Sequence, residues 1–175
     1  MSTIYLDTET TGLAAEHGHR IVELAIVDDR GVALMDTLVD PRRAIPADAR
    51  AIHGITQMMV RGKPTLEALL PEIGRLIRSS GHVVIYNATF DTPFLPAALW
   101  HGIRVDCAMR RFAELGSGGP SGRWQRLEVA AERCGHVWSG AQHRALADAL
   151  AARTVWRWCQ GRREGAPPTA RRRLT

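Results

Sequence analysis

The sequence lacks any long apolar run. No stretch approaches the ~20 consecutive apolar residues that cross a bilayer, so a membrane-spanning helix is not expected. The N-terminal residues also lack the charged segment and apolar stretch of a secretory signal. Without such a signal, the expected compartment is the cytoplasm.

Cysteine is scarce. The three cysteines, Cys107, Cys134 and Cys159, are widely spaced and odd in number. This excludes a disulfide framework and a CxxC zinc site, and it predicts reduced thiols that are mostly buried. No internal repeat is visible, which excludes a solenoid.

The body of the chain has little net charge. The whole chain carries 23 basic and 18 acidic side chains, for a net charge of +5. Residues 161–175 hold five Arg and one Glu, so +4 of this charge lies at the C-terminal end. We expect one folded domain over residues 1–160 and a disordered basic tail over 161–175. The charge permits a polyanionic substrate and does not require one.

Hydrophobic patterning predicts strands first and then strands that alternate with helices. Alternation and buried apolar runs indicate five strands, beginning at Ile4 and covering 20–28, 32–39, 83–86 and 103–107. Helical periodicity and capping signals indicate helices over 47–52, 64–77, 92–100, 108–115, 125–134 and 143–160. This order predicts an α/β fold with a mixed five-stranded sheet flanked by helices.

The first strand carries two acidic residues on one face. Because side chains alternate along a strand, Asp7 and Glu9 point to the same side as Tyr5. No Lys or Arg stands near them in sequence to pair with them. A divalent cation would relieve their repulsion, because Mg²⁺ and Mn²⁺ prefer carboxylate ligands. The alternative is a solvated polar face on an edge strand.

Two later carboxylates and a histidine extend this pattern. Asp91 follows the predicted strand 83–86, where ligand crevices form, but it also fits a helix N-cap. Asp148 lies on or beside an alanine-lined face of the last helix, where an unpaired charge is costly. Arg144, four residues earlier, offers it a surface ion pair as the competing explanation. His143 is either a solvated surface residue or a group that accepts a proton from water near neutral pH.

These residues lie in four segments that occur in order along the chain. The segments are Asp7-Thr8-Glu9-Thr10-Thr11-Gly12, Ile52-His53-Gly54-Ile55-Thr56, Asn87-Ala88-Thr89-Phe90-Asp91 and His143-Arg144-Ala145-Leu146-Ala147-Asp148. Together they resemble the DnaQ-like 3′→5′ exonucleases of the DEDD class with a catalytic histidine. The resemblance covers residues 2–158 and implies a ribonuclease H-like fold.

The resemblance implies a role for each matching position. Asp7, Glu9 and Asp148 match the ligands of one metal ion, and Asp7 and Asp91 match those of a second. The implied cofactors are two divalent ions, Mg²⁺ or Mn²⁺, and His143 matches the general base. The residues that match positions at or near the terminal nucleotide are Thr10, Leu13, His53 and Phe90.

The resemblance also implies the substrate and leaves alternatives open. The stretch 47–60 and the His143 motif are most similar to exonuclease X and the polymerase proofreading subunit, which favours DNA. An RNA-trimming exonuclease is the enzyme alternative, and a non-catalytic nucleic-acid-binding or polymerase-associated module is the other. Besides nucleic acid, the partners left open are a polymerase and a second copy of the chain.

The chain departs from the family pattern in two places. Tyr86 stands where these enzymes often have His, and a glycine-rich loop covers residues 116–122. Trp124, beside this loop, is expected either to pack in the core or to stack on a base. Four arginines flank the loop and form either a solvated face or a track for a phosphate backbone: Arg110, Arg111, Arg123 and Arg126.

Overall fold

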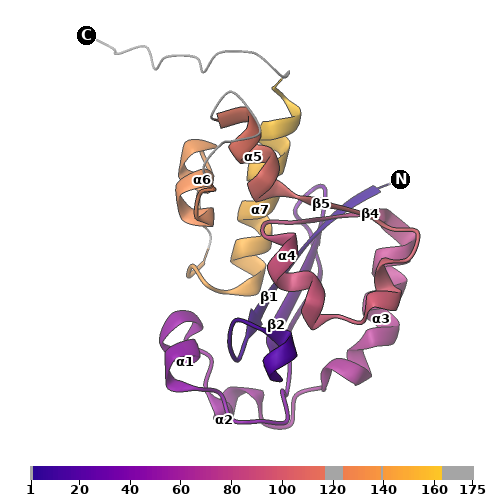
Figure 1. The fold of residues 1–175 in the computed structure, drawn as a ribbon, viewed down its shortest axis with the longest axis vertical. Helices are drawn as coiled ribbons and strands as arrows, with labels where there is room; N and C mark the ends of the chain where they lie inside the picture. Colours follow the sequence, from indigo (N-terminus) through magenta and orange to yellow (C-terminus); the bar gives the residue numbers. More distant parts are fainter. Residues whose placement is uncertain (1, 117–123, 139, 163–175) are drawn as a thin grey trace.

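A mixed five-stranded sheet forms the centre of the molecule. The computed structural model describes residues 2–116, 124–138 and 140–162 (Figure 1). The strands lie in the order β3-β2-β1-β4-β5, with β1 antiparallel to β2 and parallel to β4. Their bounds are β1 Ser2–Thr10, β2 Ile21–Asp28, β3 Ala33–Leu38, β4 Gly81–Ile85 and β5 Arg104–Cys107. The predicted mixed sheet is confirmed.

Seven α-helices and three 3-10 helices accompany the sheet in the described residues. The α-helices are α1 Ala47–His53, α2 Gln57–Val60, α3 Leu66–Ser80, α4 Ala88–Asp91, α5 Ala108–Gly116, α6 Leu127–Arg133 and α7 Ala145–Gln160. The 3-10 helices are η1 Ala15–His17, η2 Thr92–Phe94 and η3 Ala97–Trp100. No helix in the described part of the chain is long and apolar enough to span a membrane.

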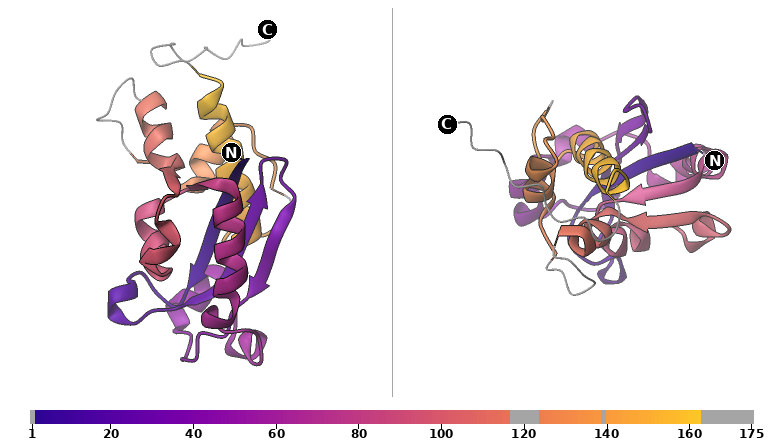
Figure 2. Two further views of the ribbon diagram at one scale, coloured as in Figure 1. Left: turned by 90° about the vertical axis from the view of Figure 1, so that its right-hand side faces the viewer. Right: turned by 90° about the horizontal axis from the view of Figure 1, so that it is seen from above.

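The two faces of the sheet are buried against different helices. Alternation along β1 sends Tyr5 into a core shared with α5, α6 and α7, and it sends Ile4 and Leu6 into a core shared with α3. Figures 1 and 2 show α7 running beside β1 and β2. Since β1 is the middle strand of this sheet, the edge-strand explanation for Asp7 and Glu9 is wrong.

Small side chains let α7 approach the sheet closely. Ala145, Ala149 and Ala152 are fully buried, and Trp156 closes the same face further along the helix. Because alanine adds little bulk, the helix backbone comes near β1, and a short side chain such as Asp148 can reach that strand. The alanine-lined face predicted around Asp148 is confirmed.

The predicted helix over 92–100 is wrong. The chain forms α4 one turn earlier and then passes through η2 and η3, with Leu95 extended between them (φ −113°, ψ 147°). Pro96 explains the break, because proline lacks an N–H and disfavours helical geometry in the residue before it. The short helices η1 and α2 were not predicted from the sequence.

The last helix begins two residues later than predicted. His143 has a left-handed backbone (φ 58°), Arg144 is extended, and the first helical residue is Ala145. The predictions for the glycine-rich loop from residue 117, for Arg123 and for the tail from residue 163 lie outside the described residues.

Candidate active site

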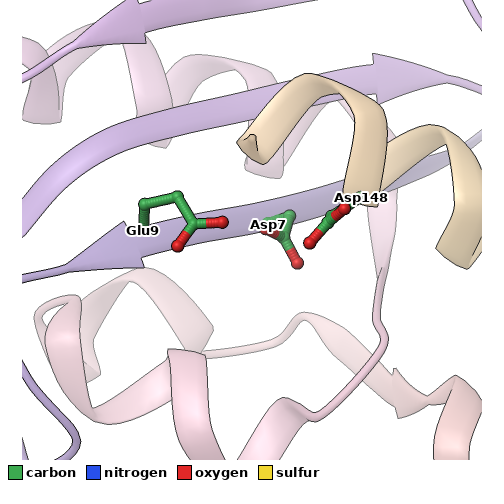
Figure 3. A group of neighbouring side chains, drawn as sticks. All are labelled: Asp7, Glu9 and Asp148. Carbon is green, nitrogen blue, oxygen red and sulfur yellow. The ribbon is translucent and has the colours of Figure 1, made fainter. Parts of the chain in front are cut away.

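Three carboxylates from two elements meet beside the centre of the sheet. Asp7 and Glu9 project from the same face of β1, and Asp148 reaches them from α7 (Figure 3). One carboxylate oxygen from each of the three lies within 4.8 Å of the other two. The pleat of the strand and the alanine face of the helix therefore bring together three groups that would repel one another when charged.

Burial and mutual repulsion disfavour the charged forms of these groups. Burial raises the pKa of Asp7 well above its usual value, and the charges of Asp91 and Asp148 add to this effect. Burial and the charge of Asp148 raise the pKa of Glu9 to about 8. The Oδ1 atom of Asp148 is buried and has no hydrogen-bond partner among the described residues. A cluster of hard oxygen donors with an unsatisfied atom fits a divalent cation.

Asp91 is fixed beside this cluster by the first strand. Its Oδ1 accepts hydrogen bonds from the Thr8 backbone N–H at 3.2 Å and from the Thr8 hydroxyl at 2.7 Å. Burial raises the pKa of Asp91 to about 7, although both bonds from Thr8 act to lower it. Asp91 is the last residue of α4, and its side chain caps no helix, so the N-cap explanation is wrong.

His143 stands next to Asp148 at the start of α7. Burial raises the pKa of Asp148 to about 6, and the charge and backbone N–H of His143 oppose that rise. The Nε2 atom of His143 lies 3.5 Å from Oε1 of Glu128 in α6. The imidazole is half-exposed, so it can contact both water and the carboxylate cluster.

Arg144 does not pair with Asp148. Its guanidinium instead holds Glu23 of β2, with Nη2 at 2.5 Å from Oε1 and Nε at 3.0 Å from Oε2. The i, i+4 ion pair expected from the sequence is therefore wrong, and Asp148 keeps its carboxylate available to the cluster.

A hollow of about 370 Å³ lies next to the end of β1 and contains two of the expected substrate-binding residues. Leu13 and Phe90 both line it, and Leu13 is 82% exposed although it is a large apolar side chain. Thr10 is buried, and its hydroxyl donates to the Gly12 carbonyl at 2.7 Å, which fixes the turn that presents Leu13. An exposed apolar side chain at the rim of a hollow suits contact with a base or sugar.

His53 is buried beside the turn after β1. Its Nδ1 accepts a hydrogen bond from the Ile55 N–H at 3.0 Å, and Nε2 is buried without a hydrogen-bond partner among the described residues. Burial lowers the pKa of His53, and the backbone of Thr10 opposes this. The structure thus brings His53 to Thr10 and does not place it in the hollow lined by Leu13 and Phe90.

The residues around the glycine-rich loop have mixed outcomes. Trp124 is 65% exposed, so the expectation that it packs in the core is wrong. Arg111 lies 3.4 Å from Glu114, and Arg110 lines another hollow, which measures about 810 Å³. That hollow lies between β5, α5 and the end of α7, and none of the clustered carboxylates line it. We therefore place the chemistry at the carboxylate cluster.

Three residues that hold or contact the site residues were not identified from the sequence. Thr8 anchors Asp91, Glu23 holds Arg144, and Glu128 lies behind His143. Thr8 points away from Asp7 in the strand alternation, and Glu23 and Glu128 each contact a residue of a different segment of the chain. Only the acidic type of Glu23, set among the apolar residues 21–27 of β2, could have drawn attention to it.

Comparison with known proteins gives concordant matches. A model of the RNase_T family, described as an exonuclease, matches residues 4–155. A protein of Escherichia phage 186 described as an uncharacterized exonuclease is 39% identical over 162 residues, which is 83% of this chain and 81% of that protein. The DNA polymerase III subunit epsilon of Treponema pallidum is 43% identical over 96 residues, which is 53% of this chain. The match covers only 44% of that subunit.

A solved structure resembles nearly the whole chain. Exonuclease X in complex with 5′ overhanging duplex DNA superimposes with a TM-score of 0.68 at 30% sequence identity. The match covers 93% of this chain and 95% of that protein.

Proposed function

Since the chain belongs to the RNase_T family of exonucleases, we propose that it releases 5′-mononucleotides from the 3′ end of DNA with divalent cations. The observation that carries this proposal is the cluster of Asp7, Glu9 and Asp148, which bring one carboxylate oxygen each to within 4.8 Å of one another. A non-catalytic module would not need to keep three buried acidic groups together at the cost of their mutual repulsion.

The acidic residues divide into two proposed sets of metal ligands. Asp7, Glu9 and Asp148 would hold one Mg²⁺ or Mn²⁺ ion, and Asp7 and Asp91 would hold a second. When bound, a pair of such ions supplies positive charge to the attacking and leaving oxygens of a displacement at phosphorus. Four carboxylates match the charge of two divalent ions, and the bonds from Thr8 keep Asp91 in place whether or not ions are present.

The proposed proton acceptor is His143. Its imidazole lies next to Asp148, is open to water, and has the carboxylate of Glu128 at 3.5 Å from Nε2. A carboxylate beside an imidazole orients the ring and stabilises the imidazolium that forms when a proton is taken from water. His143 would therefore act as the general base, and Glu128 would orient it.

The end of the substrate is proposed to lie in the hollow beyond β1. Leu13 and Phe90 would contact the terminal base or sugar, and the turn at Thr10, packed on His53, would stop the chain at its 3′ end. DNA is favoured over RNA because exonuclease X, bound to DNA, matches 93% of this chain at 30% identity. We also propose that the protein associates with a polymerase or with a second copy of itself. Its proposed location is the cytoplasm.

Incubation of 5′-labelled single-stranded DNA, duplex DNA and RNA with the protein, in Mg²⁺, Mn²⁺ or EDTA, tests this function. We expect a ladder that shortens from the 3′ end of DNA and is abolished by EDTA. Faster shortening of RNA than of DNA would establish the alternative substrate. Internal cuts, or equal activity in EDTA, would refute the mechanism.

A further inference from the structure

Glu23 is a fifth carboxylate beside the cluster, and its oxygens are already occupied. It lies on β2 directly opposite Glu9 on β1, and it is only 2% exposed. Oε1 accepts from Nε and Nη2 of Arg144 at 3.1 and 2.5 Å, and Oε2 accepts from Nε at 3.0 Å and from the Ala145 N–H at 2.9 Å. A carboxylate that accepts this many bonds has little capacity left for a metal ion.

The bonds from Glu23 reach Arg144 and Ala145, which lie between the two proposed catalytic residues, His143 and Asp148. Arg144 follows His143, whose left-handed backbone (φ 58°) is disfavoured for a residue with a Cβ. The Arg144 carbonyl accepts the N–H of Asp148 at 3.0 Å in the first turn of α7. Fixing Arg144 and Ala145 to β2 therefore fixes the turn that presents His143 and the helix that presents Asp148.

The charges of Glu23 and Arg144 act in opposite directions on the carboxylate cluster. The charge of Glu23 raises the pKa of Asp7, Glu9 and Asp148, and the guanidinium of Arg144 lowers the pKa of Glu9. Arg144 supplies the ion pair that the structure gives for Glu23 within the described residues. Arg144 therefore offsets part of the repulsion that Glu23 adds to the cluster, most directly at Glu9.

We propose that Glu23 and Arg144 form a positioning clamp that ties the start of α7 to β2 and sets His143 and Asp148 against Asp7 and Glu9 before cation or substrate binds. The two residues are positioning residues, since neither is placed against the substrate. Their effect on turnover rests on the proposed exonuclease function. Their effect on the cation-free protein does not.

A double-mutant cycle of Glu23→Gln and Arg144→Met tests the clamp. Arg144→Lys keeps the charge and loses the two-pronged geometry, and it covers the case in which Arg144→Met does not fold. The matched control is the exposed pair on α3, in which Arg75 holds Glu72 at 2.6 and 2.9 Å, changed to Glu72→Gln and Arg75→Met. All variants are compared at a temperature where circular dichroism shows each of them folded.

The first measurement uses protein without cation or substrate. Hydrogen exchange of the Ala145 amide, which donates to Glu23, is expected to be roughly tenfold faster or more in Glu23→Gln and unchanged in the controls. The second is Mn²⁺ affinity by electron paramagnetic resonance, expected to fall roughly 10–100-fold in each clamp variant. Each single change should lower the Mn²⁺ affinity as much as the double change does, and Arg144→Lys should lower it less than Arg144→Met.

Turnover on a short 5′-labelled oligonucleotide supplies the third measurement. We expect kcat to fall roughly 10–100-fold with KM within about twofold, since the clamp places catalytic groups and does not contact the substrate. The proposal would be overturned if the clamp variants unfold at a lower temperature but keep the kcat and Mn²⁺ affinity of the wild-type protein. Unchanged hydrogen exchange at the Ala145 amide would also overturn it. If wild-type protein degrades no nucleic acid, the proposed function fails, and exchange and Mn²⁺ affinity still decide the clamp.

Discussion

Thr8 donates both its backbone N–H and its hydroxyl to one oxygen of Asp91. The parallel pairing of β1 with β4 ends at Leu6 and Ile85, so Thr8 lies past the last strand partner on that side. The Asp91 carboxylate takes the position that a backbone carbonyl of β4 would otherwise fill. The end of β4 thus both frees a donor on β1 and places the acidic group that uses it.

Thr8→Val should remove one of these two bonds while it keeps the shape of the side chain. We expect turnover to fall roughly tenfold and the free energy of unfolding to fall by about 1 kcal/mol, because a buried acceptor loses its hydroxyl donor. Thr37→Val on β3 is the control, since the Thr37 hydroxyl donates to the carbonyl of the neighbouring Leu38. Equal turnover in wild-type, Thr8→Val and Thr37→Val proteins would show that the position of Asp91 does not depend on this hydroxyl.

His143→Ala should slow turnover by roughly 10²–10⁴-fold, the range for loss of a general acid–base group. The dependence of kcat on pH should also change, because the imidazole is the group that takes the proton. The measurement is kcat across the pH range at saturating Mg²⁺. A large loss with an unchanged pH profile would show that His143 acts only through structure.

The cation-free protein should lose stability as the pH rises. The pKa values of Asp7, Glu9 and Asp148 are raised by folding, to about 8 for Glu9 and about 6 for Asp148, so the folded state retains protons that the unfolded chain releases near pH 4. Stability from these groups is therefore complete at low pH and is lost as the pH rises from about 4 through about 8. The lowered pKa of His53 acts in the opposite direction, below pH 6.5.

Thermal unfolding in EDTA and in saturating Mg²⁺ checks this expectation. Mg²⁺ should raise the Tm more at about pH 8 than at about pH 5, because a cation replaces the protons. Glu9→Gln should make the EDTA profile flatter and reduce the gain from Mg²⁺. A gain from Mg²⁺ that is the same at both pH values would show that the cation does not bind at this cluster.

Leu13→Ala should weaken substrate binding and leave the fold intact. Leu13 is 82% exposed, so its truncation should change the Tm by no more than about 2 °C. We expect KM for a DNA oligonucleotide to rise about tenfold, the effect of losing one apolar contact in a binding pocket. Val32→Ala, in the exposed turn between β2 and β3, is the control. A KM shift of the same size in Val32→Ala would argue against the hollow beside Leu13 as the binding site.

The strands and the long helices could be predicted because their signals are local. Alternation in β1 places Asp7, Glu9 and Tyr5 on one face, and the alanine face of α7 places Asp148 in the core, as the structure confirms. The resemblance to DnaQ-like exonucleases and the ribonuclease H-like fold that it implies are confirmed by the family match and the solved structure. The extent of the domain, over residues 1–160, stays a prediction.

The errors concern contacts between distant segments. Arg144 lies four residues before Asp148 and could pair with it in an isolated helix, but Glu23, 121 residues away, offers a buried acceptor that also caps Ala145. Asp91 could cap a helix, but Thr8, 83 residues away, offers it two donors. Sequence spacing gives the local alternatives, and the packing of β1, β2 and α7 decides between them.

The central claim is that the carboxylate cluster performs 3′-end hydrolysis. Product release from a 5′-labelled DNA strand by wild-type, Asp7→Ala and Asp148→Asn proteins, side by side in Mg²⁺, tests it most directly. We predict that wild-type protein shortens the strand from its 3′ end and that both variants are slower by roughly 10³-fold or more, while DNA binding partly survives. Near-wild-type shortening by either variant would contradict the account.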